Sequence, residues 1–338
     1  MNLNELAREL GLSKTTISRA LNGFPEVSEK TRKRVESAAQ KFGYTPNSNA
    51  RRLAIGTSGA IGILLPDDLS DRFGPQTNEF LSGLGEGLEP TSFDLLIRPS
   101  SGGDEMSVYR RWVSARSVDA IVISVPARSD ERVQMLSDAR FPFVVHGKTD
   151  IAAPHAWLDM DNESAFNQLT NYLLDLGHEN IGVIDALPGH AFAEDRENGY
   201  RRALSSRGHS FNHELYIQDR FTVEAGFRAA RVLLSKAPRP TALVVGSMMG
   251  AIGAYQAIHS MNLEVGRDVS VIAHDDVFSY FSPTDMVPSL TTTRSSIRAA
   301  GKTIAEALVK SLTEGTPLDL AETWPVELIV RNSTGRVS

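Results

Sequence analysis

The sequence predicts an α/β protein with a small all-α head and a larger body of two lobes, each built on a parallel sheet with flanking helices. Three observations predict this fold. Positive charge is concentrated near the N-terminus, apolar residues recur at helical spacing up to residue 46, and strand-length apolar runs alternate with helical stretches from residue 59. A chain of 338 residues, of which 41% are hydrophobic, is long enough for both parts.

The net charge of −6 conceals an asymmetry between the two parts of the chain. Residues 1–60 hold ten Lys and Arg against five Asp and Glu, a charge of +5, which leaves 25 basic and 36 acidic residues, a charge of −11, for the rest. A basic head on an acidic body is typical of a protein that binds a polyanion at one end. The chain has no cysteine, so disulfides, thiolate zinc sites and cysteine nucleophiles are excluded.

We expect a cytoplasmic protein with no membrane partner. The sequence MNLNELAREL at the N-terminus lacks the basic and apolar regions of a secretory signal. No apolar run approaches the ~18 residues that a membrane-spanning helix needs.

The head contains the pattern of a helix-turn-helix. Apolar residues recur at helical spacing from Leu3 to Leu10 and stop at Gly11, which predicts a short first helix. Ser13 is a good N-cap for a second helix with Ile17 on its apolar face. Two short helices joined by a tight turn containing glycine can place the start of the second helix in a major groove of DNA.

A third helix completes the head. Ser28 is its predicted N-cap, an apolar stripe runs from Val35 to Phe42, and Gly43 ends it. The alternative interpretation of residues 1–46 is a helical cap with an ordinary solvated basic face.

The body shows the pattern of buried parallel strands separated by helices. Seven apolar runs have strand length: residues 60–66, 94–97, 120–126, 143–147, 181–186, 242–246 and 269–276. Helical stretches lie near residues 161–176, 194–207, 223–235 and 248–261. Two similar lobes with a break near residues 159–162 are therefore expected, with a ligand cleft at the carboxyl ends of their strands.

The head resembles the LacI/GalR family of repressors nearly position for position. The shared residues are Ala7, Gly11, Ser13, Thr16, Ser18, Arg19, Asn22, Val27, Thr31, Arg32, Val35, Gly43, Tyr44, Pro46 and Asn47. The resemblance implies a helix-turn-helix domain over residues 1–46, a hinge helix and linker over 47–58, and a sensing and dimerisation domain over 59–338. That domain is similar to the periplasmic binding protein fold, in which the chain crosses between lobes three times, and the second and third crossings are expected near 288–294 and 318–324.

The same resemblance implies how the head binds DNA. Lys14, Thr15 and Arg19 would face base edges, and Arg19 has the donors to pair with a guanine. Phosphate contacts would come from Thr16, Ser18, Asn22 and Ser28, and the hinge contacts from Asn47, Ala50, Arg51, Arg52 and Leu53. Leu53 would wedge into the minor groove, whereas an apolar linker residue packed on the body is the alternative.

Candidate effector residues follow from the resemblance and from residue type. Arg196 and Asp275 match the effector-binding arginine and aspartate of the family, with a structural ion pair and a helix cap as their alternatives. Many relatives have Asn-Asp where this chain has Ser247 and Met248, and an aspartate where it has Gly147, which is flanked by His146 and Lys148. Ser247 and Lys148 are therefore further candidates. The rings that are candidates for stacking on a sugar, with core packing as the alternative, are Phe73, Trp157, Phe192 and Phe278.

The leading hypothesis is a repressor that binds a pseudo-palindromic double-stranded operator as a homodimer and responds to a small carbohydrate. Segments such as PFVVHGK and AWLDMDN resemble the branch that regulates the use of α-glucosides and related oligosaccharides, so the implied effector is a di- or oligosaccharide. The alternatives are a purine or nucleoside sensor and a sugar-metabolising enzyme with a regulatory head. We expect no enzyme activity, cofactor or metal.

Three patterns that suggest other chemistry fail on spacing or context. The run Gly83, Gly85 and Gly87 is no dinucleotide fingerprint and lies in an amphipathic helical stretch. His209 and His213 have the spacing of a metal-binding pair but flank a predicted surface turn. The neighbouring carboxylates Glu194 and Asp195 do not face each other across a substrate, as glycosidase chemistry requires.

Overall fold

A computed structural model describes residues 2–21, 24–44, 57–66, 74–100, 103–274, 278–279 and 281–337. The chain divides into two compact units, Met1–Ser58 and Gly59–Ser338. None of the helices in the described ranges is both long and apolar enough to cross a membrane.

The described part of the N-terminal unit contains three helices, α1 (Leu3–Leu10), α2 (Lys14–Leu21) and α3 (Glu29–Lys41). Gly11 ends α1 in the left-handed conformation, with φ of +62°, and so allows a sharp turn into α2. A small core forms where the three helices meet, and its buried side chains are Leu6, Ala7, Ile17, Ala20, Val27, Val35, Ala38 and Ala39. The predicted three-helix head is therefore confirmed.

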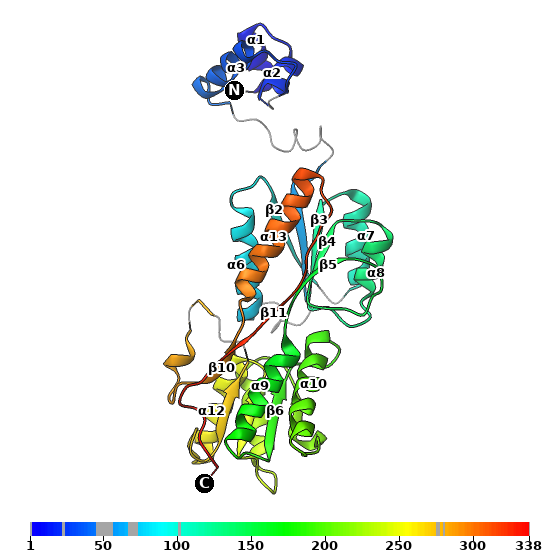
Figure 1. Cartoon of the computed structure of the whole chain (residues 1–338). Coiled ribbons are helices and arrows are strands. Elements are labelled where there is room, and N and C mark those ends of the chain that lie inside the picture. Colours follow the sequence, from blue (N-terminus) through cyan, green and yellow to red (C-terminus); the bar gives the residue numbers. More distant parts are fainter. Residues whose placement is uncertain are drawn as a thin grey trace. The chain divides into compact units, whose positions relative to one another are not determined.

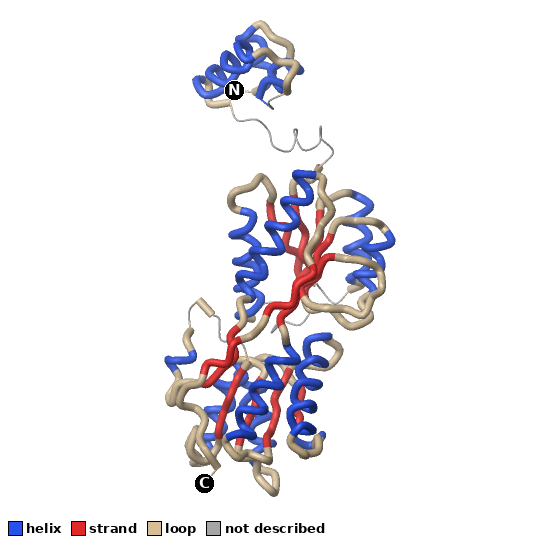
Figure 2. The backbone as a smooth tube through the Cα atoms, viewed as in Figure 1, coloured by secondary structure: helices blue, strands red, loops and turns tan. Residues whose placement is uncertain are grey.

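The C-terminal unit is built on two six-stranded sheets (Figures 1 and 2). The first has the order β11-β5-β4-β3-β1-β2, with the strands β1 (Ala60–Leu65), β2 (Asp94–Pro99), β3 (Ala120–Ser124), β4 (Phe143–His146), β5 (Ala156–Met160) and β11 (Ala321–Trp324). The second has the order β12-β10-β9-β8-β6-β7, with the strands β6 (Ile181–Asp185), β7 (Tyr216–Gln218), β8 (Ala242–Val245), β9 (Ser270–Ala273), β10 (Thr291–Arg294) and β12 (Glu327–Ile329). All pairings are parallel except that of β10 with β12.

Helices cover both faces of each sheet (Figure 1). The first lobe carries α6 (Pro75–Leu88) and α13 (Ile297–Glu314) on one face, and α7 (Glu105–Ala115) and α8 (Glu131–Asp138) on the other. The second lobe carries α9 (Asn162–Asp175) and α10 (Ala191–Ser206) on one face, and α11 (Val223–Leu234) and α12 (Met248–Ser260) on the other. Two short 3₁₀ turns, η1 (His213–Leu215) and η2 (Pro283–Asp285), lie in the loops of the second lobe.

The chain passes between the lobes three times. It leaves the first sheet after β5, returns from β10 to α13, and leaves again between β11 and β12. The second and third crossings follow Arg294 and Trp324. Three connections side by side place the carboxyl ends of most strands of both sheets around one interlobe region.

The glycine run of α6 serves helix packing rather than phosphate binding. A side chain at Gly83 would overlap with the backbone carbonyl of Arg298 in α13, and one at Gly301 of α13 would overlap with that of Phe80 in α6. Gly85, on the exposed side of α6, has nothing near its missing Cβ. Glycine therefore allows the backbones of α6 and α13 to approach closely.

Substituting these glycines tests that packing. Gly301→Ala should lower the free energy of unfolding by about 1–3 kcal/mol, because the added methyl group forces two helix backbones apart. Gly85→Ala is the matched control and should be neutral or stabilise by up to about 1 kcal/mol, because alanine favours an exposed helical position. Urea unfolding followed by circular dichroism measures both, and equal effects would contradict the close-packing account.

Candidate functional site

Helix α2 presents a polar and basic outer face. The Ser13 hydroxyl accepts a hydrogen bond from the Thr16 backbone N–H at 3.0 Å and so fixes the start of the helix. Ile17 is buried in the head core, whereas Lys14, Thr15 and Arg19 are exposed and Thr16 and Ser18 are half-buried. The three predicted base-reading residues therefore lie together on the face of α2 that faces solvent.

Helix α3 is fixed to the rest of the head by its polar residues. The Ser28 hydroxyl caps α3 by accepting a hydrogen bond from the Thr31 N–H at 3.3 Å, which uses the side chain predicted to bind phosphate. Arg32 and Arg34 each donate to a backbone carbonyl at 3.0 Å, that of Phe24 and that of Leu10. The other predicted DNA-binding residues lie outside the described residues: Asn22, Asn47, Ala50, Arg51, Arg52 and Leu53.

A cavity lies between the lobes of the body, at the carboxyl ends of the strands. Aromatic rings and polar groups share its lining, as in many carbohydrate sites. Its rings are those of Phe80, Phe192, Phe221, His146 and His274, and its other polar side chains are those of Gln76, Thr77, Ser124, Asp159, Asn162, Arg196 and Ser295.

Arg196 on α10 is the cation among the described residues that line this cavity, and it is only 7% exposed. Its guanidinium donates to Asn162 Oδ1 at 2.8 Å, to Asp185 Oδ1 at 3.1 Å and to the Gly246 carbonyl at 3.2 Å. The residue that the resemblance assigns to the effector thus also forms the structural ion pair that was its alternative. These contacts join the starts of α9 and α10 to the ends of β6 and β8.

The guanidinium is also enclosed by aromatic rings. Its central carbon lies 4.7 Å from the ring centre of Phe192, 5.4 Å from that of Phe166 and 5.6 Å from that of Phe221. Cation–π attraction strengthens when the pair is shielded from water. Arg196 is therefore held in one orientation, with Phe192 and Phe221 beside it in the cavity wall.

Burial changes the protonation of the carboxyl groups near the cavity. Burial raises the pKa of Asp185, and the neighbouring Arg196 charge opposes that effect. The pKa of Asp159 rises to about 7, mainly because of burial and also because of the Asp195 charge, while Lys148 acts in the opposite direction. Asp159 is therefore close to half-protonated near neutral pH.

Both histidines of the cavity are neutral. Burial lowers the pKa of His146 to about 4, and its ring stacks on Phe80 with the centres 4.4 Å apart. Burial and the Arg196 charge lower the pKa of His274, whose Nδ1 lies 2.7 Å from Thr293 Oγ1. Neither ring carries a charge at neutral pH.

The structure brings some of the predicted effector residues together and separates others. Phe192 and Arg196 line the cavity. The Lys148 Nζ atom lies 4.8 Å from the ring centre of Trp157, and neither residue lines the cavity. Ser247 is fully buried as the N-cap of α12, and Phe278 packs against the core beside α11 and α12.

Phe73 and Asp275 lie outside the described residues. Sequence reasoning missed Asn162, Asp185, Asp159 and Phe221. Asp185 could have been predicted from the sequence, because an acidic residue at the end of a buried strand indicates a paired or ligand-binding carboxylate. Asn162 and Phe221 become informative once the fold places them beside Arg196, and Asp159 once the lobes face each other.

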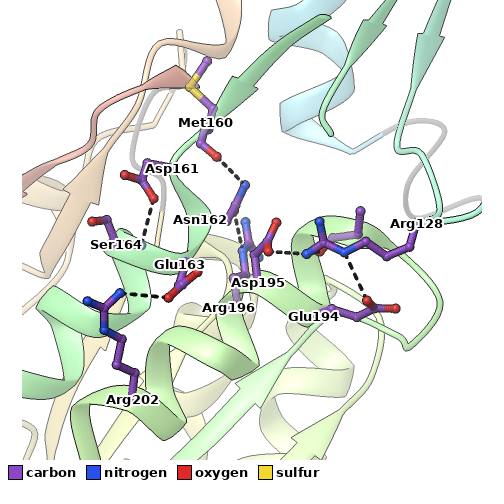
Figure 3. A network of polar contacts seen from close by, with 11 residues as sticks. Arg128, Met160, Asp161, Asn162, Glu163, Ser164, Glu194, Asp195, Arg196 and Arg202 are labelled. Carbon is purple, nitrogen blue, oxygen red and sulfur yellow. Dashed lines mark hydrogen bonds and ion pairs between the residues drawn. The ribbon is translucent and has the colours of Figure 1, made fainter. Parts of the chain in front are cut away.

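A second set of polar contacts joins the lobes beside the cavity (Figure 3). Arg128, after β3 of the first lobe, donates to the Ala191 carbonyl and to Glu194 Oε2 of α10, both at 3.2 Å. It also forms an ion pair with Asp195. The neighbouring carboxylates Glu194 and Asp195 therefore form an interlobe contact with Arg128.

Another polar contact between the lobes involves α6. Glu79 Oε1 accepts hydrogen bonds from Ser279 of the second lobe, from the backbone N–H at 2.9 Å and from the hydroxyl at 2.5 Å. Arg298 of α13 lies 3.4 Å from Glu79 Oε2 and 3.0 Å from Ser279 Oγ. In the described part of the chain, no group of three or more His, Cys, Asp or Glu side chains is arranged to hold a metal.

Removing the buried cation tests the network around Arg196. Arg196→Met should lower the free energy of unfolding by about 3–5 kcal/mol at neutral pH, because Asp185 would remain as a buried unpaired carboxylate. The double variant Arg196→Met/Asp185→Asn should recover part of this loss. Arg202→Met is the control, because Arg202 pairs with Glu163 but has a side chain that is 74% exposed, and it should cost less than about 1 kcal/mol. If both single variants lost the same free energy of unfolding in urea, the buried pair would contribute no more to stability than the exposed one.

Family models and full-length relatives match both parts of the chain. A model described as bacterial regulatory proteins, lacI family, matches residues 2–47, and one for a periplasmic binding protein-like domain matches residues 170–334. The HTH-type transcriptional regulator AglR of Rhizobium meliloti (strain 1021) is 40% identical over 337 residues, which cover 99% of this chain and 94% of that protein. The HTH-type transcriptional regulator RafR of Escherichia coli is 30% identical over 326 residues, or 96% of each chain.

Solved structures share the fold over nearly the whole chain. The transcriptional regulator CelR in complex with cellobiose has a TM-score of 0.72 and 26% identity, and the match covers 98% of this chain and 99% of that one. The lac repressor dimer bound to operator and the anti-inducer ONPF has a TM-score of 0.84 at 24% identity, with 99% of both chains covered. The resemblance found in the sequence is therefore confirmed, and the chain belongs to the LacI family of bacterial DNA-binding transcription regulators.

Proposed function

We propose that this protein is a transcriptional repressor that binds a pseudo-palindromic operator as a homodimer and whose operator affinity is controlled by an uncharged carbohydrate. The observation that carries the proposal is that one chain combines a helix able to read a DNA groove with a cavity lined by rings and hydrogen-bonding groups. A protein that reads chromosomal operators acts in the cytoplasm.

The exposed face of α2 supports the part of the proposal that concerns DNA. Lys14, Thr15 and Arg19 read base edges, because they lie on the solvent side of a helix whose other side is fixed in the head core. The phosphate contacts proposed for this helix and its surroundings come from Thr16, Ser18, Asn22 and Ser28. Asn47, Ala50, Arg51, Arg52 and Leu53 are proposed as the hinge contacts, with Leu53 in the minor groove.

The charge of the cavity supports an uncharged effector. Arg196 is the cation of the cavity lining, and the buried Asp185 carboxylate already pairs with it. Asp159 adds a further carboxyl, and among the described lining residues there is no spare positive charge for an anionic sugar or a sugar phosphate. Phe192 and Phe221 offer flat apolar surfaces of the kind that pack against sugar rings.

We further propose a di- or oligosaccharide of the α-glucoside type. The support is the resemblance of segments such as PFVVHGK and AWLDMDN to the regulators of that branch. The solved complex of CelR with cellobiose shows that a relative of this fold has been captured with a disaccharide.

The coupling between sugar and operator follows from a two-lobed body. A ligand that favours one arrangement of the lobes shifts their equilibrium, and coupling free energies of this kind are about 1–3 kcal/mol. Arg128 contributes to this equilibrium, because it joins the first lobe to α10 of the second beside the cavity.

Operator binding is the first test. Fluorescence anisotropy on DNA upstream of the gene, at fixed salt, should show specific binding that one of maltose, sucrose or trehalose weakens by about 5–150-fold. Nucleobases belong in the same panel, since a response to them alone would establish a purine sensor instead. Specific binding that no sugar changes would refute control by carbohydrate.

Replacing Arg19 tests which side chains read bases. Arg19→Ala should cost about 1–3 kcal/mol of operator affinity and reduce discrimination at one position of each half-site. Arg8→Ala removes the same charge from an exposed position of α1 and should weaken all sequences alike and by less. Identical losses on operator and random DNA for both variants would show that Arg19 does not read a base.

The interlobe contact gives a separate prediction. Arg128→Gln should weaken binding of the active sugar by about three- to tenfold, because the lobes lose their ion pairs around the cavity. Arg202→Gln removes an ion pair within the second lobe and should leave the affinity unchanged. Isothermal titration calorimetry measures both, and an unchanged affinity in the Arg128 variant would show that the contact does not contribute to closure.

A further inference from the structure

Asp159 differs from the other polar groups around the cavity. It lies near the end of β5 in the first lobe, lines the cavity and is only 6% exposed. Within the described residues, no side chain donates a hydrogen bond to its carboxylate, whose pKa is lowered by the neighbouring backbone N–H of Met160 but raised more by burial. A carboxylate can accept up to about four hydrogen bonds, so most of its capacity is unused.

Asp185 shows what a satisfied buried carboxylate looks like in the same body. One of its oxygens accepts from Arg196 at 3.1 Å and the other from the Tyr216 hydroxyl at 3.2 Å. Removing a carboxylate from water costs several kcal/mol unless hydrogen bonds replace the lost water. Asp159 bears that cost without comparable partners, and its carboxyl is therefore available to a ligand.

We propose that Asp159 is an effector-binding residue that accepts hydrogen bonds from hydroxyl groups of an uncharged sugar. The proposal rests on the carbohydrate function proposed above and adds the residue that selects hydroxyl donors. Asp159 belongs to the first lobe, whereas Arg196 and Asn162 belong to the second. A sugar held by both sides therefore joins the lobes, and an effector with a carboxylate or phosphate facing Asp159 is rejected.

The proposal predicts that sugar affinity rises with pH. Free Asp159 has a pKa of about 7, and hydroxyl donors favour its ionised form, so binding lowers the pKa and releases protons. The stabilisation that the sugar gains from the carboxylate is thus present above the pKa of the free protein and is lost as the pH falls below it. Between pH 6 and pH 8 the affinity should rise up to about tenfold, with about half a proton released at pH 7.

The other charged groups around Asp159 do not produce this dependence. His146 and Lys148 lie at and after the end of β4, and the histidine is already neutral above its pKa of about 4. Asp195 and Arg196 of α10 are in ion pairs with Arg128 and Asp185. Among the described residues, Asp161 before α9 also raises the pKa of Asp159, Glu322 lies on the neighbouring strand β11, and the neutral His274 lines the same cavity.

The test is calorimetric titration of the full-length protein with maltose, sucrose and trehalose at pH 6, 7 and 8, in two buffers of different ionisation enthalpy. Asp159→Asn should bind the active sugar at least tenfold more weakly at pH 8 and show neither the rise in affinity with pH nor the proton release. Asp161→Asn is the matched control. It removes a neighbouring charge, keeps a side chain able to cap α9, and should retain the pH dependence.

The outcomes separate the two proposals. A melting temperature for Asp159→Asn equal to or above that of the parent confirms that the variant is folded. If the parent protein binds a sugar but its affinity does not change with pH, or if Asp159→Asn keeps the affinity of the parent, the role of Asp159 is refuted while the carbohydrate function stands. If the parent protein binds none of the three sugars and no operator response to sugar is seen, the carbohydrate function fails and the role of Asp159 fails with it.

Discussion

The buried contact between Arg196 and Asp185 is the interaction on which the cavity depends. A charged pair taken out of water is stable only when its remaining hydrogen bonds are also satisfied. In this body the requirement is met by Asn162, the Gly246 carbonyl and the Tyr216 hydroxyl, which come from different segments of the second lobe. The pair therefore fixes the ends of β6 and β8 relative to the starts of α9 and α10, and this fixed surface forms one wall of the cavity.

Much of the fold could be predicted because its local signals agree with one another. The long apolar runs of β1, β3, β4, β6, β8 and β9 are buried on both faces and are readable as strands without any alignment. The strands that had no such signal are short or polar. Strand β7 (Tyr216–Gln218) has only three residues. Strand β10 (Thr291–Arg294) consists of three threonines and an arginine. Their pairing depends on distant neighbours and not on local pattern.

The candidate site was less predictable than the fold. Arg196 could be named because the family resemblance marks it, and Phe192 because a ring near an apolar strand can stack on a ligand. Asp159 and Asn162 lie in a segment that the resemblance covers, but the sequence does not indicate that Asp159 lines a cavity or that Asn162 bonds to Arg196. The choice among the candidate stacking rings was open for a similar reason. Phe278 follows an apolar run and Trp157 lies close to the predicted break between the lobes, as a ligand-stacking ring could, yet both have neighbours in the protein core. Residue type and loop position alone do not separate a ring that lines a cavity from one that fills a core.

The close approach of α6 and α13 has a consequence for how such a regulator can change over evolution. Helices whose backbones touch through Gly83 and Gly301 cannot slide past each other without opening a void or a clash, so the pair moves as a single rigid piece. Both helices begin near the cavity, since Phe80 and Ile297 line it. Side chains at the cavity can therefore be exchanged to suit a new ligand, while the packing of α6 against α13 stays the same.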